Sequence, residues 1–310
     1  MTDSDAASSS EGTIERRAEA RDKARQLRAT QKKKDRRLRL LLQGGLGLAA
    51  VAVIAIVAVV IVGSVRPEGS GPRNMASDGI RFDAGFEVVP TAGLAPGEQP
   101  EPSAPSAAGV VDVVVFTDYL CIFCADFDDE MDDLLTTLVD SGAATLEIHP
   151  LATLTNRSAG TQYSLRAANA AACTANFAPD AFLAVHAALF DAQPEPDTAG
   201  LTDAELLDLV RDAGADSGSM ERCIEDRRFS AWVQAATTRA QTGPLPIAST
   251  EVESLGGTPL VLVNGLRYAG TDPFDAADFS QFILQAAGDD IDLEPSPSPS
   301  PSASASPAAP

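Results

Sequence analysis

Residues 110–139 have the sequence VVDVVVFTDYLCIFCADFDDEMDDLLTTLV, in which two cysteines separate a β-branched run from an amphipathic segment. The run at 110–117 is short and apolar, as in a buried strand. After Cys124, apolar side chains recur at helical spacing, at Phe127, Met131, Leu134, Leu135 and Leu138. We therefore predict a strand that leads directly into a helix, with Cys121 and Cys124 where the helix begins.

The Cys121-Ile122-Phe123-Cys124 motif carries the chemistry of this stretch. Two thiols separated by two residues close a small disulfide ring when the first lies at a helix start. Unpaired N–H groups and partial positive charge there stabilise a thiolate at Cys121, and the thiolate is the species that attacks a disulfide. A lone CxxC also occurs in structural zinc sites and by chance. The order strand, CxxC, helix favours a redox pair with Cys124 as the resolving thiol.

The segments that follow complete an α/β pattern. Residues 144–151 predict a second strand, and 159–242 predict a helical block with a capping box at Thr202 and Glu205. A turn, a proline and a strand are expected over 252–264, a hairpin turn at Gly265 and a closing helix at 274–287. The order of these elements predicts one α/β domain over residues 110–288.

Cys173 and Cys223 form a second pair, 50 residues apart within the helical block. In an exported domain they can form a lasting disulfide, and closing that loop would stabilise the block by about 4 kcal/mol on a chain-entropy estimate. A zinc site built from all four cysteines is the alternative. Such sites usually combine two closely spaced pairs, so we expect a structural disulfide and no metal.

Charge divides the chain at a long apolar segment. Residues 1–43 have twelve basic and seven acidic side chains, a net charge of +5, whereas 66–310 have eleven arginines and 37 acids, a net charge of −26. A membrane span needs about 20 apolar residues, and we assign a transmembrane helix to 44–65. The positive-inside rule puts the basic segment 1–43 in the cytoplasm. A cleaved signal peptide is the competing interpretation, but residues 63–67, GSVRP, are a poor cleavage site.

Two further segments have the composition of linkers. Residues 66–109 are rich in Gly, Pro, Ala and Ser, and we expect a linker with one possible edge strand at 80–89. Residues 289–310 form a Pro/Ser/Ala tail that we expect to be disordered. The acidic runs are expected to be solvated surface, and the basic segment is expected to face anionic lipid rather than nucleic acid.

Only two histidines are present, and they belong to no metal-spaced cluster. His186 is expected to be packed in a helix or exposed. His149 precedes Pro150 at the end of a predicted strand, where it could influence Cys121. No nucleophile or metal motif of the common hydrolases occurs, so hydrolytic chemistry has no support.

Three motifs along the chain resemble the DsbA-like branch of the thioredoxin superfamily, in particular its membrane-tethered actinobacterial members. They are Phe116-Thr117-Asp118-Tyr119-Leu120-Cys121 with Cys124, Tyr163-Ser164-Leu165-Arg166-Ala167-Ala168 leading to Cys173, and Gly257-Thr258-Pro259 followed by Val263-Asn264-Gly265. The resemblance covers about residues 80–288. It implies a thioredoxin-like α/β fold with the helical block 159–242 inserted into it, preceded by one transmembrane helix.

The resemblance also implies an activity. In this family the CxxC pair exchanges its disulfide with the thiols of exported proteins, so Cys121 and Cys124 would be catalytic. Pro259 would be a cis-proline that faces this pair. The backbone of Thr258 would then bind the substrate chain.

The remaining implications concern the second cysteine pair and the partners. Cys173 and Cys223 would form a second, non-catalytic disulfide. Reduced exported proteins would be the substrates, and a membrane reoxidase resembling the DsbB or vitamin K epoxide reductase families would restore the disulfide, with no soluble cofactor. The protein would be a single-pass cell-membrane protein with a cytoplasmic N-terminus and an extracytoplasmic catalytic domain.

The sequence departs from this family between the two cysteines, where Ile122 and Phe123 replace the Pro-His or Pro-Phe often found there. No imidazole is available in the motif, and several acids near the helix start oppose a negative charge on Cys121: Asp118, Asp126, Asp128, Asp129 and Glu130. We therefore expect Cys121 to be less acidic than in the strongest oxidases of the family. A reductase or isomerase of the same fold is an alternative, as is a non-catalytic, membrane-tethered binding module with structural disulfides.

Overall fold

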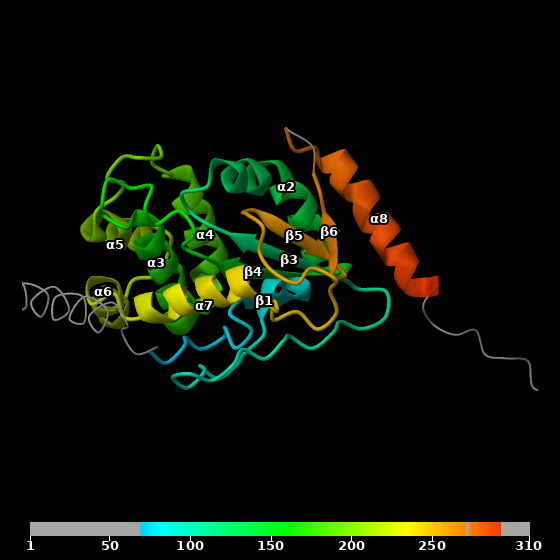
Figure 1. Cartoon of the computed structure of the whole chain (residues 1–310), viewed down its shortest axis with the longest axis horizontal. Helices are drawn as coiled ribbons and strands as arrows, with labels where there is room; N and C mark the ends of the chain where they lie inside the picture. Colours follow the sequence, from blue (N-terminus) through cyan, green and yellow to red (C-terminus); the bar gives the residue numbers. More distant parts are fainter. Residues whose placement is uncertain (1–68, 271–272, 293–310) are drawn as a thin grey trace, which may run out of the picture. The chain divides into compact units, whose positions relative to one another are not determined.

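The strand and helix predicted on either side of the CxxC motif are β3, Val111–Thr117, and α2, Ile122–Asp140. The computed structural model describes residues 69–270 and 273–292, and Figure 1 shows a central sheet with helices around it. The predicted second strand is confirmed as β4, Ala144–Pro150, which pairs in parallel with β3. These three elements form a βαβ unit, which needs a helical crossover because parallel strands cannot be joined by a tight turn.

The sheet has six strands in the order β2-β1-β4-β3-β5-β6. β1, Ile80–Asp83, and β2, Glu87–Val88, form one edge, and β5, Leu260–Val263, and β6, Leu266–Tyr268, form the other. All pairings between these strands except β3 with β4 are antiparallel. The single edge strand predicted at 80–89 is therefore two strands, separated by the short 3₁₀ helix η1, Ala84–Phe86.

The central strand β3 is buried on both faces, which explains its nearly continuous apolar sequence. Val113 and Val115 belong to the larger core, which also contains apolar side chains of α2 and of α8, Ala276–Asp292. Val114 and Phe116 point to the opposite face, where they join a smaller core with Ala240, Leu245, Leu255 and Leu262. Residues that alternate along a strand face opposite sides, so β3 holds two hydrophobic layers together.

The predicted hairpin at Gly265 joins β5 to β6. Val263 pairs with Leu266, which leaves Asn264 and Gly265 as a two-residue turn, and both have positive φ, 50° and 78°. This is the backbone that a type I′ turn requires, and Asn-Gly is its preferred sequence. A Cβ atom at position 265 would clash with the carbonyl oxygen of Ser249, so the turn also needs glycine for space.

The helical block predicted at 159–242 consists of five α-helices. They are α3, Tyr163–Phe177; α4, Phe182–Asp191; α5, Asp203–Asp212; α6, Gly218–Glu225; and α7, Ser230–Thr242, with the 3₁₀ helix η2, Pro179–Ala181, before α4. Figure 1 shows α3 to α6 gathered to one side of the sheet. The predicted capping box is confirmed, because Thr202 accepts from Glu205 N while the Glu205 carboxylate accepts from Thr202 N.

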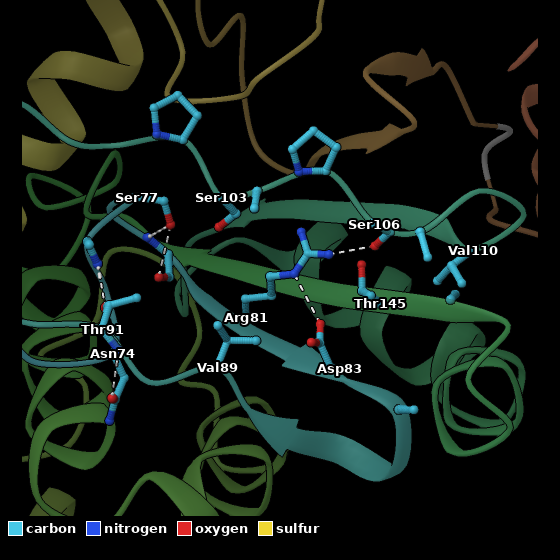
Figure 2. Close-up of a pocket in the computed structure, with 18 of the residues that line it drawn as sticks. Asn74, Ser77, Arg81, Asp83, Val89, Thr91, Ser103, Ser106, Val110 and Thr145 are labelled. Atoms are coloured by element: carbon cyan, nitrogen blue, oxygen red, sulfur yellow. Dashed lines mark hydrogen bonds and ion pairs between the residues drawn. The ribbon is translucent and has the colours of Figure 1, made fainter. Parts of the chain in front are cut away.

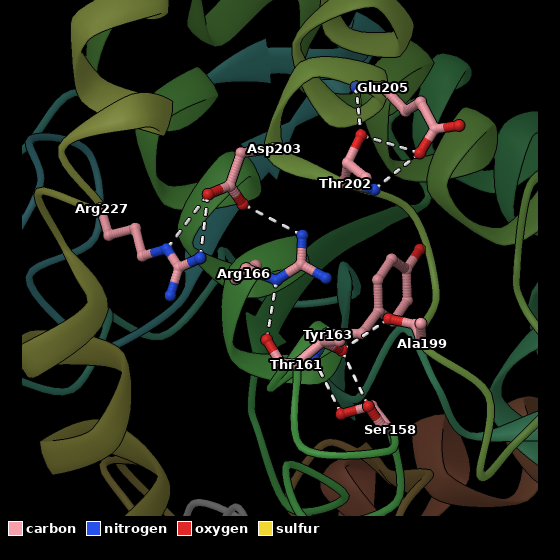
Figure 3. Close-up of polar contacts among 9 residues, drawn as sticks. All are labelled: Ser158, Thr161, Tyr163, Arg166, Ala199, Thr202, Asp203, Glu205 and Arg227. Carbon is pink, nitrogen blue, oxygen red and sulfur yellow. Dashed lines mark hydrogen bonds and ion pairs between the residues drawn. The ribbon is translucent and has the colours of Figure 1, made fainter.

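Within this block, two arginines from separate segments bind the carboxylate of Asp203, the first residue of α5 (Figure 3). Arg166 of α3 is 4% exposed and donates to the Asp203 carboxylate at 3.0 Å and to the carbonyl oxygen of Thr161 at 3.0 Å. Arg227, which follows α6, binds the other oxygen of Asp203 at 2.9 Å. A buried guanidinium needs such partners, because leaving its charge unpaired inside the protein would be costly.

The disulfide predicted between Cys173 and Cys223 is present and joins α3 to α6. Both residues are nearly fully buried in the core of the helical block. Because these sulfurs are bonded to each other, they cannot contribute thiolates to a metal. The alternative of a zinc site built from all four cysteines is therefore wrong.

The interpretation of 66–109 as a linker is wrong for its described part, 69–109, which packs against the domain. Met75, Ile80 and Phe82 are at most 1% exposed. Asp78 is 4% exposed on its side chain and accepts two hydrogen bonds from the Arg239 guanidinium of α7, at 2.7 and 2.8 Å. The segment has few large apolar residues, but four of them, Met75, Ile80, Phe82 and Leu94, are buried, and composition averages conceal this.

The closing helix is longer than predicted. α8 continues to Asp292, so residues 289–292, which were predicted as the start of the tail, are helical. The apolar periodicity ends at Ala287, which is why the last turn carries no signal in the sequence. Within residues 69–270 and 273–292, no helix has the length and apolar character of a membrane span. The predicted span 44–65, the basic segment 1–43 and residues 293–310 lie outside the described residues.

Candidate active site

Cys121 and Cys124 lie at the junction of β3 and α2. Cys121 is the N-cap residue of α2, with an extended backbone, and Cys124 lies in the first turn. The N–H groups of Cys124 and Ala125 donate to the carbonyl oxygen of Cys121 at 3.0 and 3.2 Å, which starts the helix. Both thiols are free, and the two residues are 4% and 2% exposed. The predicted placement of the pair at a helix start is confirmed.

The two thiols have opposite acidities. A hydrogen bond from the Cys124 thiol is the main cause that lowers the pKa of Cys121 to about 7, and Thr258 and the Cys124 backbone N–H contribute. Burial and the charge of Asp118 act in the opposite direction on that pKa. Burial raises the pKa of Cys124 well above its ordinary value. Cys121 is thus the group that becomes a thiolate, and Cys124 remains a thiol.

Thr258 and Pro259 lie beside the redox pair, 137 residues away along the chain. The Cys121 thiol donates to the carbonyl oxygen of Thr258 at 3.2 Å. The Thr258–Pro259 peptide bond is cis, as predicted. Pro259 directly precedes β5, which pairs with β3, and this pairing brings the two segments together.

Asp118 organises the loop that leads from β3 to Cys121. Its buried carboxylate accepts hydrogen bonds from the backbone N–H groups of Leu120 and Leu154 and from the hydroxyls of Thr153 and Ser164, at 2.7 to 2.9 Å. Burial raises the pKa of Asp118 above its ordinary value, although these hydrogen bonds offset part of the rise. The sequence indicated only its charge, because its four partners lie in three separate segments.

His186 contacts both Tyr119, in the loop before Cys121, and Asp128 of α2, which the sequence did not predict. It is 6% exposed, its Nδ1 is 2.9 Å from the hydroxyl oxygen of Tyr119, and its Nε2 is 2.9 Å from Oδ1 of Asp128 on α2. The expectation of helix packing holds for its contacts with Phe182 and Phe190. The sequence did not predict its polar contacts with Tyr119 and Asp128, because His186 belongs to the inserted helical block and is 67 residues from Tyr119 and 58 from Asp128.

His149 has other partners. It is fully buried, its Nε2 is 3.0 Å from the Glu147 carboxylate, and its ring stacks on Phe116. Phe116 belongs to the smaller core, whereas both redox cysteines belong to the larger one, so the sheet lies between them. The hypothesis that His149 acts on Cys121 finds no contact to support it.

Ile122 and Phe123 are the exposed part of the motif. Their exposures are 54% and 52%, and only two other large apolar side chains among the described residues are classed as exposed, Leu266 and Leu284. Exposed large apolar groups that lie together usually mark an interaction site. They lie between the two cysteines, so this exposed apolar surface adjoins the redox pair.

A cavity of about 550 Å³ lies at the opposite end of the strands (Figure 2). Its lining comes from 74–110 and from Gly142, Ala144 and Thr145, which lie at the start of β4, whereas Cys121 follows the end of β3. Three of its polar side chains already have partners: Arg81 donates to Ser106 and to Asp112, and Thr145 donates to Asp112. Neither redox cysteine lines this cavity.

The fold and the site together define a thioredoxin-like protein with a CxxC redox pair. Residues 104–284 match a family model described as Thioredoxin, which is more than half of the chain. The chain therefore belongs to the thioredoxin family, and the predicted thioredoxin-like α/β fold is confirmed. No curated protein sequence matches the chain significantly.

Several solved structures are similar to this chain. The reduced disulfide bond oxidoreductase DsbG of Mycobacterium tuberculosis has 30% identity over 57% of this chain and 78% of its own, with a TM-score of 0.47. Oxidised DsbA of the same organism has 29% identity over 68% and 93%, with a TM-score of 0.49. MdbA of Corynebacterium diphtheriae, a thiol-disulfide oxidoreductase, has 15% identity over 71% and 95%, with a TM-score of 0.45.

Proposed function

We propose that this chain is a membrane-anchored, extracytoplasmic thiol–disulfide oxidoreductase of the DsbA-like branch that exchanges its Cys121–Cys124 disulfide with thiols of exported proteins. The position of Cys121 carries the proposal. It caps α2, lies 3.2 Å from the Thr258 carbonyl oxygen and has a pKa lowered to about 7, while the pKa of Cys124 is raised. The cysteine that exchanges with the substrate and the cysteine that resolves the mixed disulfide need this contrast.

The exchange has two steps. A substrate thiolate attacks Sγ of Cys121 in the oxidised pair, which forms a mixed disulfide and releases Cys124, whose sulfur takes up a proton. A second substrate thiolate attacks the substrate sulfur of the mixed disulfide and releases Cys121. The substrate loses two electrons and two protons to form a disulfide, and the protein is left with two reduced cysteines.

The acidity of Cys121 assists the second step, in which it is the leaving group. A thiol with a low pKa leaves faster, and the hydrogen bonds that lower its pKa to about 7 stabilise it as it departs. Cys124, with its raised pKa, holds its proton and can resolve the mixed disulfide only once that proton is lost. The geometry therefore favours release of an oxidised substrate.

Substrate binding is assigned to the surface around Thr258 and Pro259. The cis bond before Pro259 lies beside Cys121, so an extended chain aligned with Thr258 would bring its cysteine to the reacting sulfur. Exposed Ile122 and Phe123 add apolar contact at the same place. Reduced, incompletely folded chains present both extended backbone and apolar side chains, so they are the substrates that this surface suits.

The direction of electron flow follows from how strongly the thiolate is stabilised. A pKa of about 7 for Cys121 is near that of thioredoxin, about 7, and well above that of DsbA, about 3.5. The contribution of a hydrogen bond from one thiol is weaker than that of an imidazolium, which the motif lacks. The pair should thus be a milder oxidant than DsbA, and its equilibrium with glutathione separates an oxidase from a reductase or isomerase.

The location and the reoxidising partner belong to the same proposal. The basic segment 1–43 and the apolar segment 44–65 support a single span with the redox domain outside the cytoplasm. The disulfide between Cys173 and Cys223 suits an oxidising compartment. A membrane reoxidase of the DsbB or vitamin K epoxide reductase type would accept the two electrons.

One assay tests the proposed function. The purified full chain, oxidised beforehand, is added to a reduced, unfolded protein whose activity requires disulfides. The native chain and Cys173→Ser should restore activity, whereas Cys121→Ser should not. Equal yields with and without Cys121 would favour the alternative, a binding module in which both cysteine pairs are structural.

A further inference from the structure

We propose that Gln193 is a positioning residue that holds the redox loop, Tyr119–Cys121, against the helical insertion and thereby keeps Cys121 at the N-terminus of α2. The inference rests on the proposed function, because it concerns how reactive Cys121 is. Gln193 stands 72 residues after Cys121, and no sequence pattern singles it out.

The chain around Gln193 is fixed by the end of α4. The N–H of Ala192 donates to the carbonyl oxygen of Ala188 at 3.1 Å, and that of Gln193 donates to Phe190 at 2.9 Å. Pro194 follows, and proline disfavours helical backbone in the residue before it. Gln193 is therefore held at a defined point just beyond the helix.

The carboxamide of Gln193 reaches the redox loop directly. Its Nε2 lies 3.2 Å from the carbonyl oxygen of Tyr119 and 3.1 Å from that of Cys121. A carboxamide nitrogen carries two hydrogens, so each carbonyl can receive one of them. The two carbonyls stand on either side of Leu120, and binding both fixes the path of the chain into the helix.

The same insertion holds the side chain of Tyr119. His186, on α4, lies 2.9 Å from the Tyr119 hydroxyl oxygen and 2.9 Å from Asp128 of α2. Tyr119 is fully buried and its ring packs on Phe190. Both the backbone and the side chain of Tyr119 are thus bound by α4 and the residues just after it.

Fixing this loop matters for the thiolate. The carbonyl that Gln193 binds is the one that accepts from the N–H groups of Cys124 and Ala125 and so starts α2. If the loop moved, Cys121 would lose its alignment with the Cys124 thiol and with the N-terminus of α2. The thiolate would then be less stabilised, and a smaller fraction of Cys121 would react at neutral pH.

The test uses the full chain with the isosteric variant Gln193→Met and the charge-bearing variant Gln193→Glu. The rate of Cys121 alkylation by iodoacetamide, with the modified residue identified by mass spectrometry, is measured against pH. We expect Gln193→Met to slow alkylation at pH 7 by about two- to tenfold, the range that one net hydrogen bond represents, with the profile shifted to higher pH. Gln193→Glu should slow it more, because a carboxylate would face two carbonyl oxygens.

Gln285→Met is the matched control, since Gln285 is exposed on α8 and forms no hydrogen bond with the loop. It should leave the profile unchanged. A Gln193→Met protein with the native profile, and with a native circular dichroism spectrum, would overturn the inference while leaving the proposed function intact. If the native chain itself shows no enhanced reactivity at Cys121, the proposed function fails instead.

Discussion

Cys121 and Cys124 have the same chemistry and differ only in their surroundings. Cys121 caps a helix and receives a hydrogen bond from its neighbour, whereas Cys124 is enclosed by apolar side chains of the larger core. Burial disfavours the charged form of an acid, and hydrogen bonds to the charged form favour it. The different acidities of the two thiols thus arise because Cys121 caps α2 and Cys124 lies buried in its first turn.

The first prediction concerns the pH dependence of this pair. Because the pKa of Cys121 is lowered to about 7, its thiolate fraction should rise as pH increases through that value and level off above it. Alkylation of the reduced protein at Cys121 should therefore be half-maximal near pH 7. In the unfolded chain the same residue should titrate near the ordinary value of about 8.5. Identical profiles for folded and unfolded protein would contradict this account.

At the level of helices and strands, the features that the sequence predicted are those set by residues close together along the chain. The capping box at Thr202, the Asn-Gly turn and the period of α2 each depend on residues within a few positions of one another. Arg166 and Asp203 are 37 residues apart, and Gln193 is 72 residues from Cys121. Such contacts depend on how helices pack, so the sequence alone did not predict them.

The disulfide between α3 and α6 gives the second prediction. It closes a loop of 50 residues, for which the chain-entropy estimate is about 4 kcal/mol of stability. The double variant Cys173→Ser/Cys223→Ser should lower the free energy of unfolding in urea by roughly that amount. Cys121 alkylation should keep its native pH profile in the folded protein, and its loss would show that the bridge belongs to the reactive site.

For the whole domain, the sequence predicted the order of strands and helices and the inserted helical block. It placed the start of the domain at residue 110, although residues before that position are part of the core. Residues 69–109 have the composition of a linker, yet Met75, Ile80 and Phe82 complete the core and β1 pairs with β4. A few well-spaced apolar residues are enough to dock a segment on a sheet edge. Their partners lie more than 60 residues later, so no local pattern distinguished them from a flexible tether.

The third prediction tests this boundary by truncation. A chain that begins at residue 69 should unfold cooperatively in urea. One that begins at residue 110 loses four buried apolar side chains, Met75, Ile80, Phe82 and Leu94, and burying a large apolar side chain contributes about 1.5–3 kcal/mol out of a typical total of about 5–15 kcal/mol. It should be severely destabilised or unfolded by circular dichroism. Equal stability of the two chains would restore the linker interpretation.

The central claim is that Cys121 is the sulfur that forms the mixed disulfide with the substrate, and trapping that intermediate tests it most directly. The full chain with Cys124→Ser, which lacks the resolving thiol, is mixed with a disulfide-bonded peptide and mapped by mass spectrometry. We predict a stable adduct at Cys121 that forms much faster at pH 7 than in the denatured chain. No adduct, or one that forms equally fast in the denatured chain, would contradict the account.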